Sequence, residues 1–88
     1  MVKRKRTQAS IKLRAIRKKQ GLTFAEVHSH SQAIAGKLGR KEFAIPPSRL
    51  HDFEVQGVVP SIFRVYTLAR VYRFPVSTIL SWYGVPKH

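Results

Sequence analysis

A short stretch near the middle of the chain, residues 45–54, reads IPPSRLHDFE and brings several polar side chains together. Ser48, Arg49, His51 and Asp52 supply a hydroxyl, a guanidinium, an imidazole and a carboxylate. Such groups can form hydrogen bonds with the edges of nucleic-acid bases or with phosphate oxygens. Asp52 and Glu54 are also two of only four acidic residues in a strongly basic chain, so the presence of each needs an explanation.

The polar side chains do not predict an enzyme. Serine, histidine and aspartate all occur, but nothing in their spacing places a base beside a nucleophile, and the chain has no glycine-rich phosphate loop. His28 and His30 point to different faces of any helix that contains them, and no cysteine is present to complete a metal site. We therefore expect no enzyme activity, no metal, no cofactor and no small-molecule substrate.

The charge of the chain favours a polyanionic partner. Seventeen lysines and arginines stand against four acidic residues, a formal net charge of +13, and residues 1–19 contain nine of these cations and no acid. Such an excess favours binding to DNA, RNA or an anionic membrane. A membrane is the weakest of the three, because the basic N-terminal region lacks bulky aromatic anchors and no apolar run is long enough to span a bilayer.

The length and composition of the chain fit one small domain. Eighty-eight residues, 43% of them apolar, are enough for a single core. Cysteine is absent, and the basic N-terminus is not followed by the apolar segment of a secretory signal. We expect a soluble cytoplasmic protein, associated with the nucleoid if the source is bacterial. Residues 1–7 are expected to form a flexible basic arm, and residues 8–88 the folded domain.

Apolar periodicity and capping signals predict two helices in the first half of the chain. The first helix runs from Ala9 and ends before Gly21. Thr23, with Glu26 three residues later, has the spacing of a capping box and predicts the start of a long second helix. The predicted inner stripe of the second helix consists of Val27, Ser31, Ile34 and Leu38.

A loop and a third helix are predicted next. Residues 39–46 break the helical pattern, and Pro47 is suited to the first turn of a helix. Leu50, Phe53 and Glu54 then share the inner face of this third helix. Residues 57–60 contain a glycine and a proline and predict a turn.

Two further helices complete the predicted fold. Ser61 is positioned to cap the fourth helix, and Pro75 separates it from a short fifth helix that closes at Gly84. No segment alternates with a period of two residues, so we expect an all-α fold of five helices. The predicted inner stripe of the fourth helix consists of Ile62, Val65, Leu68, Ala69 and Tyr72.

Three blocks of the sequence, in the same order, resemble helix-turn-helix domains of the Cro and lambda-repressor type, the XRE-like family. Leu13–Val27 reads LRAIRKKQGLTFAEV and is similar to the family pattern LRxLRxxxGLTxxEL. Ile45–Glu54 resembles the recognition helix, and Pro60–Leu80 resembles the closing helices of that fold. The resemblance covers residues 9–84 and implies a compact lambda-repressor-like DNA-binding domain that regulates transcription, with double-stranded DNA as its partner and a homodimer as its common form.

The resemblance also implies roles for individual residues. The third helix would enter the major groove, with the second helix and the N-terminal arm on the DNA backbone. Arg17 and Glu54 match an arginine–glutamate pair that this family buries between its first and third helices. The DNA-binding candidates are Lys3, Arg4, Lys5 and Arg6 in the arm, Thr23 and Phe24 at the start of the second helix, and Pro47, Ser48, Arg49, His51 and Asp52 on the third.

The chain departs from the family pattern in three regions, one of which is residues 57–59, where the family commonly has a lysine or arginine before the proline. An insertion at about residues 32–44 separates the second helix from the third, where the family has a short connection. This insertion either extends the second helix or covers part of the reading face. His28 occupies a position that is usually small, and Phe24 stands where the family often has a glutamine that reaches a phosphate.

Several alternatives stay open on the sequence alone. Asp52 can accept a hydrogen bond from cytosine, or it can pair with a nearby arginine. Phe63 and Tyr66 can pack under the insertion or contribute to a dimer interface. Two other functions also remain, namely an RNA-binding or ribosome-associated basic protein and a protein-interaction module on the same scaffold.

Overall fold

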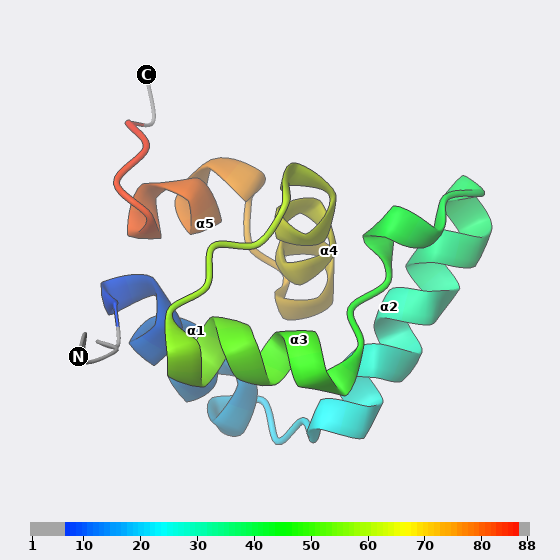
Figure 1. Cartoon of the computed structure of the whole chain (residues 1–88), viewed down its shortest axis with the longest axis horizontal. Coiled ribbons are helices and arrows are strands. Elements are labelled where there is room, and N and C mark those ends of the chain that lie inside the picture. The colour runs from blue at the N-terminus through cyan, green and yellow to red at the C-terminus, as the bar shows by residue number, and fades with distance from the viewer. Residues whose placement is uncertain (1–6, 87–88) are drawn as a thin grey trace.

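The computed structural model describes residues 7–86, and this part of the chain is helical without strands. The five α-helices pack into a compact all-α domain (Figure 1), which confirms the predicted fold class. Two short helical turns of other types, η1 and η2, flank α3. The elements are α1 (Gln8–Lys19), α2 (Phe24–Leu38), the 3₁₀ turn η1 (Lys41–Phe43), α3 (Pro47–His51), the π-helical turn η2 (Asp52–Gln56), α4 (Ile62–Tyr72) and α5 (Val76–Trp82).

Side chains cap the helix starts where the sequence predicts them. Thr23 and Glu26 form the full capping box of α2, since each side chain accepts a hydrogen bond from the backbone N–H of the other residue. The Ser61 hydroxyl accepts from the backbone N–H of Arg64 at the start of α4. Pro47 is the first residue of α3, where a missing N–H costs nothing.

The third predicted helix has two parts. It is α-helical over Pro47–His51 and then widens into the π-helical turn η2, which ends at Gly57. Gly57 has a φ of 70°, a left-handed conformation that glycine adopts without a steric penalty. The widened turn still leaves Leu50, Phe53 and Glu54 buried, as predicted.

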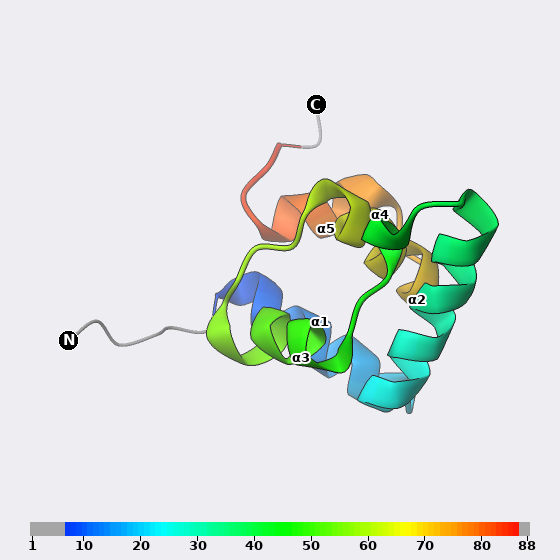
Figure 2. The ribbon, with the colours of Figure 1, turned by 45° about the vertical axis from the view of Figure 1, so that its right-hand side comes forward.

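One apolar core joins all the helices. Figures 1 and 2 both place α3 beside α1, and η2 contacts α1 directly. The α4 helix packs against α2 and α5, while α5 also contacts α1. The core is built from Leu13, Val27, Ile45, Leu50, Phe53, Val65, Leu68, Ala69, Tyr72 and Ile79.

The predicted inner stripe of α2 was partly wrong. Val27 and Ser31 are fully buried, but the next buried residue is Ala35, and Leu38 is 45% exposed. Ile34 is only half-buried. The last turn of α2 extends away from α1 and α5 (Figure 1), so an apolar residue there has no core to enter.

The predicted stripe of α4 was wrong at one position. Ile62 is 75% exposed, whereas Val65, Leu68, Ala69 and Tyr72 are buried. Ile62 has the spacing of the buried face, but it is the first residue of α4 and stands at a helix end that no other element covers. No helix among residues 7–86 is long and apolar enough to cross a membrane.

Candidate nucleic-acid interface

The α3 helix has one buried face and one open face. Leu50 lies in the core, while Pro47, Ser48, Arg49 and His51 are exposed. The exposed side chains are four of the predicted DNA-contact residues, and the structure brings them together on a single surface. We call Pro47, Ser48, Arg49, His51 and Asp52 the α3 surface.

An ion pair between Arg17 and Glu54 lies beneath the α3 surface and holds it against α1. Arg17 Nε lies 2.8 Å from Glu54 Oε2, and its Nη2 lies 3.0 Å from Glu54 Oε1. The pair expected between these two residues is therefore present, in bidentate form. A third hydrogen bond runs from Arg17 Nη1 to the carbonyl oxygen of Leu22. These contacts tie α1 and the corner before α2 to the turn that ends α3.

The ion pair is nearly removed from water. The side chain of Glu54 is 1% exposed and that of Arg17 is 12% exposed. The hydrogen bond to Glu54 raises the pKa of Arg17 above its ordinary value. Burial raises the pKa of the nearby Tyr72 hydroxyl, and the charge of Glu54 raises it further. A buried carboxylate of this kind is tolerated because Arg17 neutralises it.

The carboxylate of Asp52 already interacts with two neighbouring side chains of α3. Its Oδ2 lies 3.4 Å from Arg49 Nη1, and its Oδ1 lies 3.9 Å from His51 Nδ1. The side chain is 29% exposed, whereas that of Arg49 is 57% exposed. Of the two roles open to Asp52, pairing with an arginine is the one made within this chain.

Thr23 caps the start of α2, and Phe24 supports the α3 surface from the first turn of that helix. The hydroxyl of Thr23 is used in the capping box, so it has one accepting site committed to the backbone. The Phe24 ring stacks on the Arg17 guanidinium at 4.4 Å and meets His51 edge-to-face at 6.4 Å. Phe24 thus connects the ion pair to α3, a packing role that its place in the family pattern does not indicate.

The insertion before α3 is held by side chains of α2 and α4. Four backbone groups of residues 43–45 are bonded in this way. The carbonyl of Phe43 accepts from Thr67 Oγ1 at 2.6 Å, and that of Ala44 accepts from Arg64 Nε at 2.9 Å. At Ile45, the N–H donates to Ser31 Oγ at 2.9 Å and the carbonyl lies 3.0 Å from His28 Nδ1.

The insertion also covers the aromatic side of α4. The Phe43 ring meets Phe63 and Tyr66 edge-to-face, with centroids 5.3 and 5.5 Å apart. Arg40 stacks on the Phe63 ring at 4.7 Å. Of the two alternatives for Phe63 and Tyr66, packing under the insertion is correct. The insertion extends α2 and then folds back over α4.

Comparisons with family models, with curated proteins and with solved structures give no match for this chain. The resemblance to helix-turn-helix domains therefore depends on the residues described above. The arm residues Lys3, Arg4, Lys5 and Arg6 lie outside the described residues. Within residues 7–86, no group of three or more histidine, cysteine, aspartate or glutamate side chains could hold a metal ion.

The α3 surface offers a small set of hydrogen-bonding groups. It presents one hydroxyl, one imidazole and one guanidinium to the outside, with a carboxylate partly behind them. An arginine can contact guanine or a phosphate, and serine and histidine can contact either a base or the backbone. The surface has no asparagine or glutamine to read adenine, so its capacity for direct base recognition is small.

Proposed function

We propose that this protein is a DNA-binding transcriptional regulator whose repressor-like helix-turn-helix places α3 in the major groove. The observation that carries the proposal is the two-sided character of α3. Its inner residue Leu50 is buried in the core and the η2 turn that follows it is held to α1 by the Arg17–Glu54 pair, while Ser48, Arg49 and His51 are exposed. A rigid helix with an open polar face is what docking into a groove requires.

The charge of the chain supports the same proposal. A net charge of +13 supplies the attraction to phosphates that accounts for most non-specific DNA affinity. In the proposed complex, the arm residues Lys3–Arg6 follow the DNA backbone or enter a minor groove. Specificity then comes from a few base contacts together with the shape of the DNA.

We also propose that the regulator acts as a homodimer on a two-fold operator. Three apolar side chains are exposed close together in the chain, between the end of η2 and the first residue of α4. Val58 is 43% exposed, Val59 65% and Ile62 75%. Apolar side chains grouped in this way are often covered by a partner. Sedimentation of the V59S/I62S double variant tests this part, because it should stay monomeric at concentrations where the parent chain dimerises.

Gel retardation of duplex DNA at low salt tests DNA binding itself. We expect retardation by the parent chain and weaker retardation by the triple variant Ser48→Ala, Arg49→Ala, Asp52→Ala. Arg40→Ala with Glu42→Ala is the matched control, since it removes an exposed arginine–acid pair elsewhere. No retardation at low salt would refute the proposal, and equal retardation by both variants would show that α3 is not the reader. A preference for structured RNA in competition would favour the RNA-binding alternative.

A further inference from the structure

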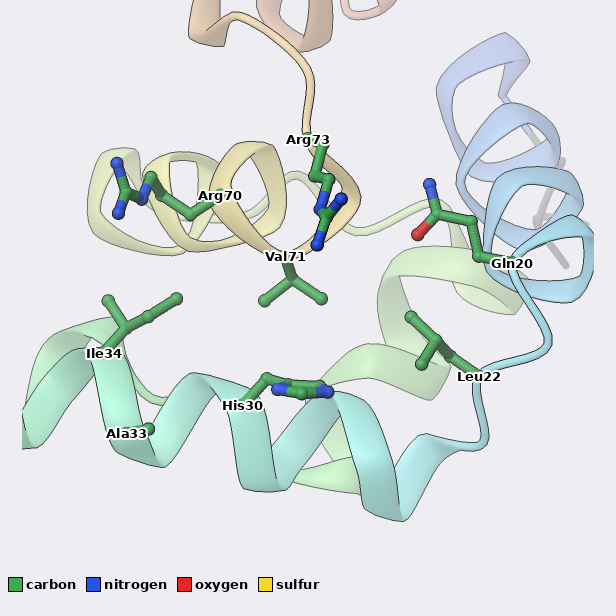
Figure 3. A pocket seen from close by; sticks show the side chains of 8 residues that line it. All are labelled: Gln20, Leu22, His30, Ala33, Ile34, Arg70, Val71 and Arg73. Atoms are coloured by element: carbon green, nitrogen blue, oxygen red, sulfur yellow. The ribbon is translucent and has the colours of Figure 1, made fainter.

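An open cleft lies between α2 and the C-terminal end of α4 (Figure 3). Its volume is about 680 Å³. Leu22, Ile34 and Val71 are half-buried and form an apolar floor. In Figure 3, Val71 points from α4 toward α2, with Arg70 and Arg73 on either side of it. The cleft is thus apolar in the middle and cationic along its α4 edge.

The polar lining of the cleft has no negative charge. Arg70, Arg73, His30 and Gln20 complete the wall together with Ala33, and none of the chain's four acidic residues takes part. Gln20 is held in place, since its Nε2 donates to the carbonyl oxygen of Tyr72 at 3.0 Å. An occupant that neutralises the two arginines must therefore bring its own negative charge, which carboxylates supply in a protein partner.

Arg73 has an unusual backbone conformation. It is the residue that ends α4, and its φ of 64° is the only positive value among the non-glycine residues that the structure describes. Glycine is the residue that adopts this conformation most easily, so an arginine here weakens the fold. In return, its guanidinium lies at the cleft. The cost to the fold is explained if the guanidinium binds something there.

The cleft is separate from the α3 surface. Along α2, Val27, Ser31 and Ala35 form the buried stripe. With about 100° per residue, His28 lies on one side of that stripe and Ile34 on the other. His28 contacts the segment that leads into α3, whereas Ile34 lines the cleft. An occupant of the cleft therefore leaves α3 free.

We propose that the cleft is a docking site for an acidic amphipathic helix of a partner protein. Leucine-like side chains of that helix lie on the floor, and carboxylates one turn apart pair with Arg70 and Arg73. Arg70 lies in the last turn of α4 and Arg73 is the residue that ends this helix, so both line the same edge of the cleft and can pair with acids at positions i and i+4 of the partner helix. A groove between two helices with an apolar floor is a common receptor for such helices. This inference does not depend on DNA binding.

Fluorescence anisotropy with two labelled synthetic helices tests the proposal on the full chain. The first peptide has leucines on one face and flanking glutamates, and the second has the same charge with alanine at each leucine position. The leucine peptide should bind about tenfold more tightly than the alanine peptide. Equal binding would overturn the proposal, since it would mean that the +13 chain merely attracts any polyanion.

Three variants locate the binding. Ala33→Glu places a charge in the cleft at an exposed helical position and should weaken the leucine peptide about tenfold. Arg70→Glu should do the same. Lys41→Glu is the control for Arg70→Glu, because it makes the same charge change at an exposed residue outside the cleft. Equal weakening by Lys41→Glu and Arg70→Glu would overturn the docking site.

The Arg73→Gly variant separates the role of Arg73 in peptide binding from its effect on the stability of the fold. Glycine fits the left-handed conformation, so this variant should have a higher melting temperature than the parent chain. It should also bind the leucine peptide several-fold more weakly, because one guanidinium is lost. A variant that gains stability and keeps its affinity would show that Arg73 has no binding role and would overturn the proposal.

Discussion

The hydroxyl oxygen of Ser31 accepts a hydrogen bond at 2.9 Å from the backbone N–H of Ile45, fourteen residues further along the chain. This bond is fully buried, and the Ser31 hydroxyl also donates to the carbonyl oxygen of His28 at 2.7 Å. The contact determines where the insertion ends and hence where α3 begins. A polar residue in the middle of a buried helix stripe thus positions the candidate interface.

Replacement of Ser31 by alanine should destabilise the fold markedly. The N–H of Ile45 would lose its partner in a buried position, which costs about 1–3 kcal/mol. Chemical denaturation measures this loss. Ser29→Ala is the matched control, since Ser29 is exposed on the same helix and its loss should change the free energy of unfolding by less than about 0.5 kcal/mol. Similar effects of the two variants would contradict the role of Ser31.

The Arg17–Glu54 pair should show strong coupling in a double-mutant cycle. Glu54→Leu leaves the Arg17 charge without its partner in a nearly buried position, which should cost about 3 kcal/mol. Combining it with Arg17→Met should cost much less than the sum of the two single changes. Denaturant unfolding of the four proteins gives the coupling energy, and additive effects would mean that the pair contributes little.

Arg49 should contribute one phosphate contact to the proposed DNA complex. Replacement of Arg49 by alanine should then reduce the slope of log K against log salt by about one. Titration of a labelled duplex at several salt concentrations measures the slope. Lys41→Ala is the comparison, because it removes an exposed cation away from the α3 surface. The same slope for the parent chain and Arg49→Ala would place Arg49 outside the interface.

Substitution by serine should affect the free energy of unfolding very differently at Ile62 and at Val65. Ile62 is 75% exposed, so Ile62→Ser should alter the free energy of unfolding by less than about 0.5 kcal/mol. Val65 is 3% exposed, so Val65→Ser should cost more than about 2 kcal/mol. Both are measured at a concentration where the chain is monomeric. Equal costs would mean that Ile62 is buried.

Stability should fall in alkaline solution. Burial raises the pKa of Tyr83 to about 12, from an ordinary value of 10.0, and burial also raises the pKa of Tyr72. Between these pH values the unfolded state loses the proton that the folded state still holds. The stabilisation is therefore complete below pH 10 and decreases as the pH rises toward 12.

Tyr83→Phe tests the origin of this alkaline loss. The variant lacks the Tyr83 hydroxyl, so the decline in its free energy of unfolding across the same pH range should be smaller than in the parent chain. Denaturation curves recorded below pH 10 and near pH 12 give the comparison. An identical decline in both proteins would show that the Tyr83 hydroxyl does not cause it.

Local signals in the sequence predict the helix starts well, because the interactions that cap a helix come from neighbouring residues. The capping box of Thr23 and Glu26 and the first-turn position of Pro47 are examples. The buried stripes were less accurate. Leu38 and Ile62 have suitable spacing, but they stand at helix ends where no other element covers them. Spacing predicts which residues share a face, and only tertiary packing determines how far along a helix that face is buried.

The hydrogen bonds that hold the insertion in place could not be predicted from local sequence patterns. The side chains that bond the carbonyls of Phe43 and Ala44 and both backbone groups of Ile45 come from α2 and α4. Thr67, for example, bonds Phe43 from twenty-four positions away. The same limit applies to the role of Phe24, since its contact with His51 forms only when α2 and α3 meet.

Because side chains of α2 and α4 hold the carbonyls of Phe43 and Ala44 and both backbone groups of Ile45, foreign sequence spliced into the stretch from Arg40 to Glu42 would interrupt the η1 turn and still leave the segment that leads into α3 bonded. All three residues of the stretch from Arg40 to Glu42 are exposed, and the end of α2 is capped on its own by Gly39. Lengthening a loop between two fixed ends costs little entropy. An affinity tag or a fluorescent label could thus be inserted between Lys41 and Glu42 to follow the chain without disturbing α3.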